Sequence, residues 1–180
     1  MLSLFQGWWK KYHIFISYSI FIMIAGTLLH FVYEWSNENA FAAMFSAINE
    51  SVWEHLKIFF VPALFFTLFA FYYKGEEYPN YLWCQTKSIL AGLVFIVVVY
   101  FTYTGIMERN CSVIDIGSFY VAAIISGIVS ERCVKKSCNK NGEFNIFAGV
   151  ILLVLWAMFI CFTYRVPDFL TKWMPGLFLE

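Results

Sequence analysis

A short polar stretch directly before an apolar run carries most of the side chains that could do chemistry. It is the nine-residue sequence Asn49-Glu50-Ser51-Val52-Trp53-Glu54-His55-Leu56-Lys57, with two carboxylates, one imidazole and one ammonium group. Ionisable groups at the edge of a hydrophobic segment are costly to place, so each needs a partner or a function. This stretch is therefore the first candidate for a functional site.

A second pair of ionisable residues, His30 and Glu34, lies near the end of the preceding apolar run. Their spacing of four places both side chains on one face of a helix. Two helices that each present a carboxylate and an imidazole to one gap resemble the metal sites of helical bundles. Mixed nitrogen and oxygen ligands suit a divalent metal such as zinc. The predicted metal ligands are His30, Glu34, Glu54 and His55.

The same stretch also suggests hydrolytic chemistry. Glu50 and Glu54 form another pair four apart, and His55 is turned about 100° from Glu54 on a helix. A metal-bound water with a spare carboxylate as general base can hydrolyse a lipid or a peptide bond. We therefore predict Glu50, Glu54 and His55 as catalytic residues. The other polar candidates are Asn49, Lys57, Tyr103, which can hydrogen-bond into the cluster, and Asp115.

Other interpretations of these residues stay open. In a purely structural one, Glu50 and Glu54 pair with Lys57 or Arg109, and Asp115 pairs with Arg109 or Arg165. In another, the carboxylates exchange protons in a small ion-coupled or proton-coupled transporter. In a third, the chain is a non-catalytic partner subunit. The zinc signature H-E-x-x-H is absent from the sequence, so spacing alone does not choose among them.

Composition defines the elements that must position these residues. The chain has 180 residues, of which 61% are hydrophobic and 13% charged, so it belongs to the membrane class. Zero net charge and the lack of a long basic tract argue against a nucleic-acid partner, and the expected environment is a lipid bilayer. We predict an all-α fold in one integral membrane domain, residues 1–180. The expected spans are about 13–33, 56–73, 88–106, 113–130 and 146–164.

Two further elements follow from local signals. The segment between the first two spans predicts a short interfacial or re-entrant helix, and Ser46 can start a helix that carries Glu50 in its first turn. In the fourth span, small residues recur every fourth position, which favours a place in the middle of the bundle. They are Ser118, Ala122, Ser126 and Ser130.

Charge also predicts an orientation. Five spans place eight Lys and Arg residues on the side of the N-terminus and four on the other side. The positive-inside rule then makes the N-terminus cytoplasmic, the C-terminus external and the polar cluster outward-facing. Cys133 and Cys138 would be reduced cytoplasmic thiols, whereas Cys111 and Cys161 lie near the outer face, where they could form a bridge.

The Asn49–Lys57 motif belongs to a wider resemblance. Together with Leu29–Trp35, Tyr103–Ile106 and the Pro-containing segment Arg165–Phe169, it resembles a family of small uncharacterised bacterial multi-pass membrane proteins. The resemblance implies a bacterial inner-membrane location. It also implies that three of these segments form one unit, namely Leu29–Trp35, Asn49–Lys57 and Tyr103–Ile106. It implies no substrate, no cofactor and no reaction.

Overall fold

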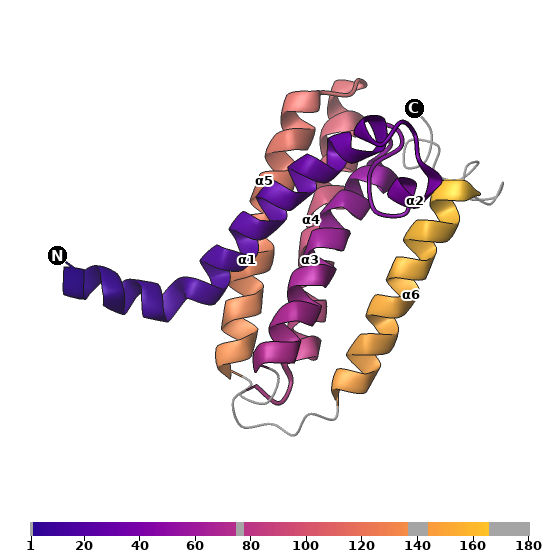
Figure 1. The fold of residues 1–180 in the computed structure, drawn as a ribbon. Coiled ribbons are helices and arrows are strands. Elements are labelled where there is room, and N and C mark those ends of the chain that lie inside the picture. Colours follow the sequence, from indigo (N-terminus) through magenta and orange to yellow (C-terminus); the bar gives the residue numbers. More distant parts are fainter. Residues whose placement is uncertain (1, 75–77, 137–143, 166–180) are drawn as a thin grey trace.

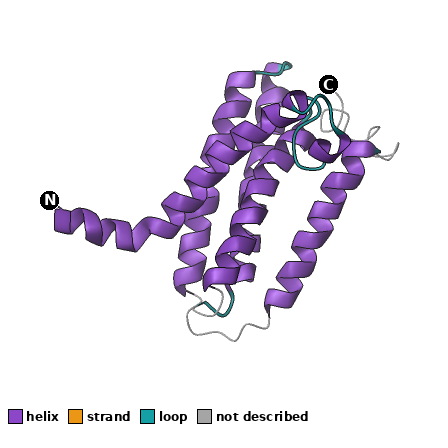
Figure 2. Cartoon of the chain, in the orientation of Figure 1, coloured by secondary structure: helices purple, strands orange, loops and turns teal. Residues whose placement is uncertain are grey.

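The computed structural model describes residues 2–74, 78–136 and 144–165, with side chains from Ile16 onward. The described residues form helices joined by loops (Figure 2). The helices are α1 (Leu2–Trp35), α2 (Ala40–Ala43), α3 (Val52–Lys74), α4 (Tyr81–Met107), α5 (Ser112–Lys136) and α6 (Phe144–Tyr164). Five of them contain a segment long and apolar enough to cross a membrane, and α2 is the short helix after the first span. The predicted all-α class is confirmed.

The observed helices are longer than the apolar runs that predicted them. Helix α1 continues back to Leu2, and its first part leads away from the bundle (Figure 1). Helix α4 begins at Tyr81 rather than near residue 88, and α5 ends at Lys136 rather than near residue 130. Polar residues continue a helix readily once its apolar part has formed, so hydropathy marks the membrane-crossing part and not the helix end.

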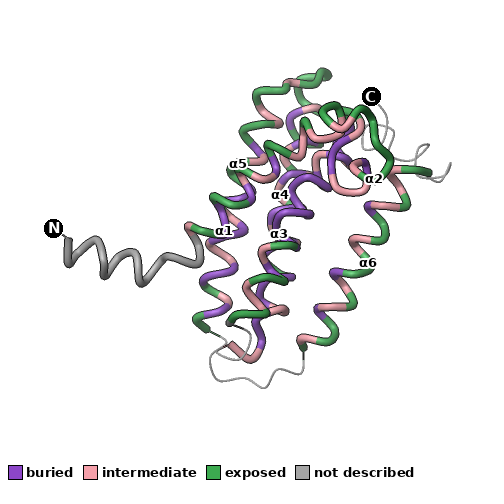
Figure 3. Tube along the Cα trace, viewed as in Figure 1, coloured by how far each residue is buried: buried purple, intermediate pink, exposed green. Residues whose placement is uncertain are grey.

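Helix α3, rather than α5, occupies the centre of the bundle. It packs against α1, α4 and α6, and its Phe59, Phe60 and Ala63 are fully buried (Figure 3). Helix α5 packs against α4 and α1. The outer faces expose large apolar side chains such as Ile146 and Leu153 on α6, which suits contact with lipid.

The small residues of α5 nevertheless make the close helix contact that their spacing predicted. The hydroxyl of Ser88 on α4 donates to the Ser126 carbonyl at 2.7 Å, and the Ser126 hydroxyl donates to the Ser88 carbonyl at 2.8 Å. Tyr18 on α1 lies 3.2 Å from the Ser126 hydroxyl. These buried hydrogen bonds join α1, α4 and α5 where close backbone approach is possible.

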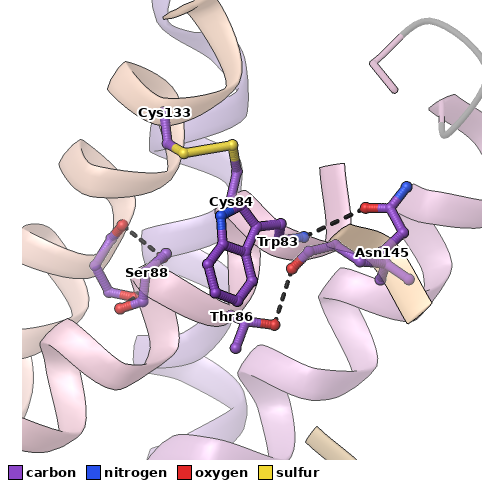
Figure 4. Close-up of a disulfide and its surroundings, with 8 residues drawn as sticks. Trp83, Cys84, Thr86, Ser88, Cys133 and Asn145 are labelled. Carbon is purple, nitrogen blue, oxygen red and sulfur yellow. Dashed lines mark hydrogen bonds between the residues drawn. A yellow bond between two sulfur atoms is a disulfide. The ribbon is translucent and has the colours of Figure 1, made fainter. Parts of the chain in front are cut away.

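A disulfide joins α4 and α5 at the end of the bundle opposite the polar cluster. It links Cys84 to Cys133, whose Cα atoms are 5.3 Å apart (Figure 4). The expectation of a reduced thiol at Cys133 is therefore wrong. Its partner Cys84 lies 49 residues earlier on a different helix, and spacing along the chain does not reveal such a pair. Cys111 and Cys161 are free rather than bridged, and Cys138 lies outside the described residues.

The disulfide and the charge bias point to opposite orientations. Disulfides persist mainly outside the cytoplasm, whereas the excess of Lys and Arg places this end of the bundle inside. The two signals therefore do not fix the orientation of the bundle in the membrane. The geometry of the polar cluster does not depend on it.

Candidate metal centre

Two imidazoles and one carboxylate converge where α1 meets the start of α3, at the upper end of Figure 1. His30 Nε2 lies 3.8 Å from Glu50 Oε1, and His55 Nε2 lies 3.5 Å from Glu50 Oε2. One ligand atom from each residue falls within 4.8 Å of the other two. Among the described residues, this is the group of His, Cys, Asp and Glu side chains that could hold a metal ion.

A turn before α3 places Glu50 in this group. The helix begins at Val52, not near Ser46 as expected, so Glu50 lies outside it. The side-chain Oδ1 of Asn49 accepts from the Ser51 backbone N–H at 3.0 Å, and the Ser51 hydroxyl accepts from the Glu54 N–H at 3.4 Å. These contacts form an Asx turn followed by a helix cap. Glu50 therefore does not share a helical face with Glu54, and it points towards the imidazoles.

The backbone also orients His55. Its Nδ1 lies 2.9 Å from the Ser51 carbonyl oxygen, one turn earlier. A proton on Nδ1 that is donated to this carbonyl leaves Nε2 with a free lone pair directed at Glu50. Metal-binding histidines usually have such a second partner, because it fixes the tautomer and the ring orientation.

Glu54 belongs to a different cluster. Its Oε2 lies 2.6 Å from Lys57 Nζ, and both side chains are buried. Lys57 Nζ also donates to the Ala43 carbonyl at 2.7 Å and to the Thr163 hydroxyl at 2.7 Å. The Thr163 hydroxyl in turn donates to Glu54 Oε1 at 2.8 Å. This closed network joins α3 to α6 and to α2. The expected pairing of Glu54 with Lys57 is therefore observed, whereas Glu50 lies beside His30 and His55 instead.

The remaining predicted residues surround the centre. Glu34 is exposed and lines a polar cavity of about 190 Å³ together with His30, Asn49 and Glu50. Its position on the same face as His30 is as predicted, but the three-residue group does not include it.

Asp115 lies at the start of α5 and lines a cleft of about 180 Å³ that His30 and His55 also line. Its Oδ1 accepts from the Tyr103 hydroxyl at 2.6 Å rather than pairing with Arg109 or Arg165, and Tyr103 also contacts Asn110. The sequence predicted that Tyr103 can hydrogen-bond into the cluster. Its hydroxyl instead bonds to Asp115, which lines the same cleft as the two imidazoles. Thr163 and Asn110 were missed, since a single polar residue at a span end is an ordinary feature.

The fold and the site together define a polytopic membrane protein with a polar His/Glu cluster at one end of its helical bundle. The chain matches the family of unknown function DUF6512 over residues 6–174, and it therefore belongs to that family. No curated protein and no solved structure matches it.

Proposed function

We propose that this protein binds one divalent metal ion, with zinc the expected ion, through His30, Glu50 and His55. The observation that supports the proposal is the convergence of these side chains from α1, the turn before α3, and α3 itself. Zinc binds histidine nitrogen and carboxylate oxygen at about 2.0–2.2 Å, so tetrahedral ligands lie about 3.4 Å apart. The separations of 3.5 and 3.8 Å involve different oxygens of Glu50, and the group as a whole lies within 4.8 Å, so side-chain rotations must bring the ligand atoms closer together to reach that value.

The ligand set favours hydrolysis over a purely structural role for the metal. Three protein ligands leave a fourth position for water, as in catalytic rather than structural zinc sites. A bound divalent ion lowers the pKa of such a water towards neutrality and supplies hydroxide as a nucleophile. Asp115 lines the same cleft as both imidazoles, and its carboxylate is held by Tyr103. We assign Asp115 as the general base, and we assign Glu54 to the ion pair that fixes α3.

We take the N-terminus to be cytoplasmic, as the charge distribution predicts, although the disulfide alone would favour the opposite orientation; this centre then faces the outside of the membrane. The reaction would then take place at the outer rim of a bacterial inner membrane.

The test is a zinc titration of the purified, chelator-treated protein, with Glu50→Gln as the variant and Glu34→Gln as its control. We expect one tightly bound zinc per chain in the wild type and in Glu34→Gln, and no comparable binding in Glu50→Gln. A wild-type protein that binds no stoichiometric zinc, manganese or iron would overturn the proposal.

The same preparation separates the proposal from its alternatives. A coupled transporter would show substrate-dependent flux in sealed vesicles without bound metal. A partner subunit would co-purify with a fixed second protein and lose stability without it.

A further inference from the structure

The centre has two different surroundings, one apolar and one polar. On one side lies the cleft of about 180 Å³ between α1 and α5, with α3 as its floor. Its apolar part is lined by Thr27, Phe31, Ile58, Ile116, Phe119 and Tyr120. On the other side, the polar cavity of about 190 Å³ is lined by Glu34, Asn49 and Glu50. His30 lines both spaces, so the metal ligands separate an apolar cleft from a polar one.

The apolar cleft opens sideways, towards the bilayer. Ile116 is 57% exposed and Phe31 is 43% exposed, and both belong to helices that are long and apolar enough to cross a membrane. At the end of the cleft away from the imidazoles, α1 and α5 are held together, because the hydroxyls of Thr27 and Tyr120 meet at 3.1 Å. Phe119 packs so tightly on Gly26 that a Cβ there would come within 2.5 Å of its ring. A molecule in this cleft therefore enters from the lipid and ends at the imidazoles.

The depth of the centre matches a particular part of a lipid. Trp35 ends α1 and is 68% exposed, as expected for an aromatic residue at headgroup level. His30 precedes it by five residues, which is up to about 7.5 Å deeper along the helix. The headgroup region on each side of the bilayer is roughly 5–8 Å thick. His30 thus lies near the boundary where headgroups give way to acyl chains, which is where the ester bonds of a glycerolipid lie.

We propose that the substrate is an ester-linked membrane lipid that reaches the centre sideways, between α1 and α5; this rests on the metal-dependent hydrolysis proposed above. The acyl chain lies in the apolar cleft and the headgroup in the polar cavity. The oxygen of water forms a bond to the acyl carbon, and the bond from that carbon to the glycerol oxygen breaks. Asp115 takes one water proton and passes it to the leaving glycerol oxygen. One ester and one water give one fatty acid and one alcohol.

The apolar walls favour a lipid over a peptide. An extended peptide would bring backbone N–H and C=O groups against Phe31, Ile58 and Ile116. Each such group left without a hydrogen bond would disfavour binding. An acyl chain has no polar groups to satisfy, and the polar part of a lipid reaches the side that can hydrogen-bond it.

The experiment uses the full chain, loaded with zinc, in vesicles of ester-linked phosphatidylethanolamine and phosphatidylglycerol. Fatty-acid release is measured by mass spectrometry, and vesicles of the ether-linked analogues serve as the substrate control. Ile116→Trp fills the mouth of the cleft. The matched control is Leu28→Trp, a similarly exposed position that lines a separate apolar groove between α1, α2 and α3.

We expect fatty-acid release from ester-linked lipids only, reduced at least about tenfold by Ile116→Trp and changed less than about twofold by Leu28→Trp, where tenfold corresponds to 1.4 kcal/mol. Zinc content should be the same in all three proteins. Bound zinc with cleavage of soluble peptides but not of lipids would overturn the lipid assignment and leave the metal site intact. Absence of zinc would instead overturn the proposed function itself.

A binding measurement covers the case in which turnover is slow. A phosphatidylethanolamine with a photoreactive group near its acyl carbonyl should label the α1 and α5 segments around Thr27 and Ile116. Labelling confined to the groove around Leu28 and Phe41 would overturn the lateral entry route.

Discussion

Two polar clusters lie at the same end of this bundle, one formed by Glu54 and Lys57 and the other by Glu50 with two imidazoles. The neighbouring residues Glu54 and His55 belong to different clusters. Glu54 and Lys57 are 2% and 0% exposed, lie 2.6 Å apart, and are closed off by Thr163 and the Ala43 carbonyl. Glu50 is 66% exposed, lies 3.5 and 3.8 Å from two imidazoles, and lines the polar cavity that His30 also lines. Buried charges must be paired because desolvation is costly, whereas half-exposed groups held at slightly long distances can accept an ion. The first cluster is a closed ion-pair network, and the second is open to solvent.

The largest expected effect comes from breaking the buried cluster. Lys57→Met leaves the Glu54 carboxylate buried without its cation, and loss of one partner from such a pair costs about 3–5 kcal/mol. We expect a correspondingly lower free energy of unfolding in detergent. The double variant Glu54→Gln/Lys57→Met should recover much of this loss, since no uncompensated charge remains. A decrease in the free energy of unfolding below about 1 kcal/mol in Lys57→Met would contradict a stabilising role for the buried ion pair.

The second effect concerns the open cluster. Loss of a residue that only hydrogen-bonds to a metal ligand lowers metal affinity roughly 10–100-fold, and loss of a ligand itself should cost more. Glu50→Gln and His55→Ala should therefore lower zinc affinity at least about 100-fold, as measured by competition with a chelating dye. Their free energies of unfolding should stay close to that of the apo wild type. If either variant unfolds as readily as Lys57→Met, the open cluster also stabilises the fold, and the contrast between the two clusters is wrong.

A smaller effect is expected next to the metal ligands. Tyr103→Phe removes the hydroxyl that donates to Asp115, and hydrogen bonds to charged groups are worth about 1.5–3 kcal/mol. We expect hydrolysis to fall about 10- to 100-fold while zinc affinity is kept, because Asp115 is positioned by Tyr103 and does not bind the metal. Equal losses of zinc and activity would make Asp115 a ligand instead of the base.

The smallest effect is expected at Glu34. Its carboxylate faces the polar cavity but is exposed, and exposed charges contribute about 0–1 kcal/mol. Glu34→Gln should change zinc affinity less than about fivefold in the same dye competition. A loss as large as that of Glu50→Gln would place Glu34 among the ligands, as its spacing from His30 first suggested.

The sequence predicted the elements of this fold better than the assignment of its carboxylates. Hydropathy was enough for five spans, because each apolar run was close to the length a bilayer needs. The i to i+4 rule grouped Glu50 with Glu54, but it holds only inside a helix, and the Ser51 cap starts the helix after Glu50. The 100° turn between Glu54 and His55 did predict that these neighbours face different partners. The Cys84–Cys133 pair and the part played by Thr163 depend on distances between helices, which a single sequence does not contain.

The central claim is that two imidazoles and one carboxylate hold the metal. X-ray absorption spectroscopy at the zinc edge of the loaded protein tests it most directly. We expect a first shell of about four nitrogen and oxygen atoms near 2.0–2.1 Å, with the multiple-scattering pattern of two imidazoles that falls to one in His30→Ala. A first shell with sulfur near 2.3 Å, or one unchanged in His30→Ala, would contradict the account.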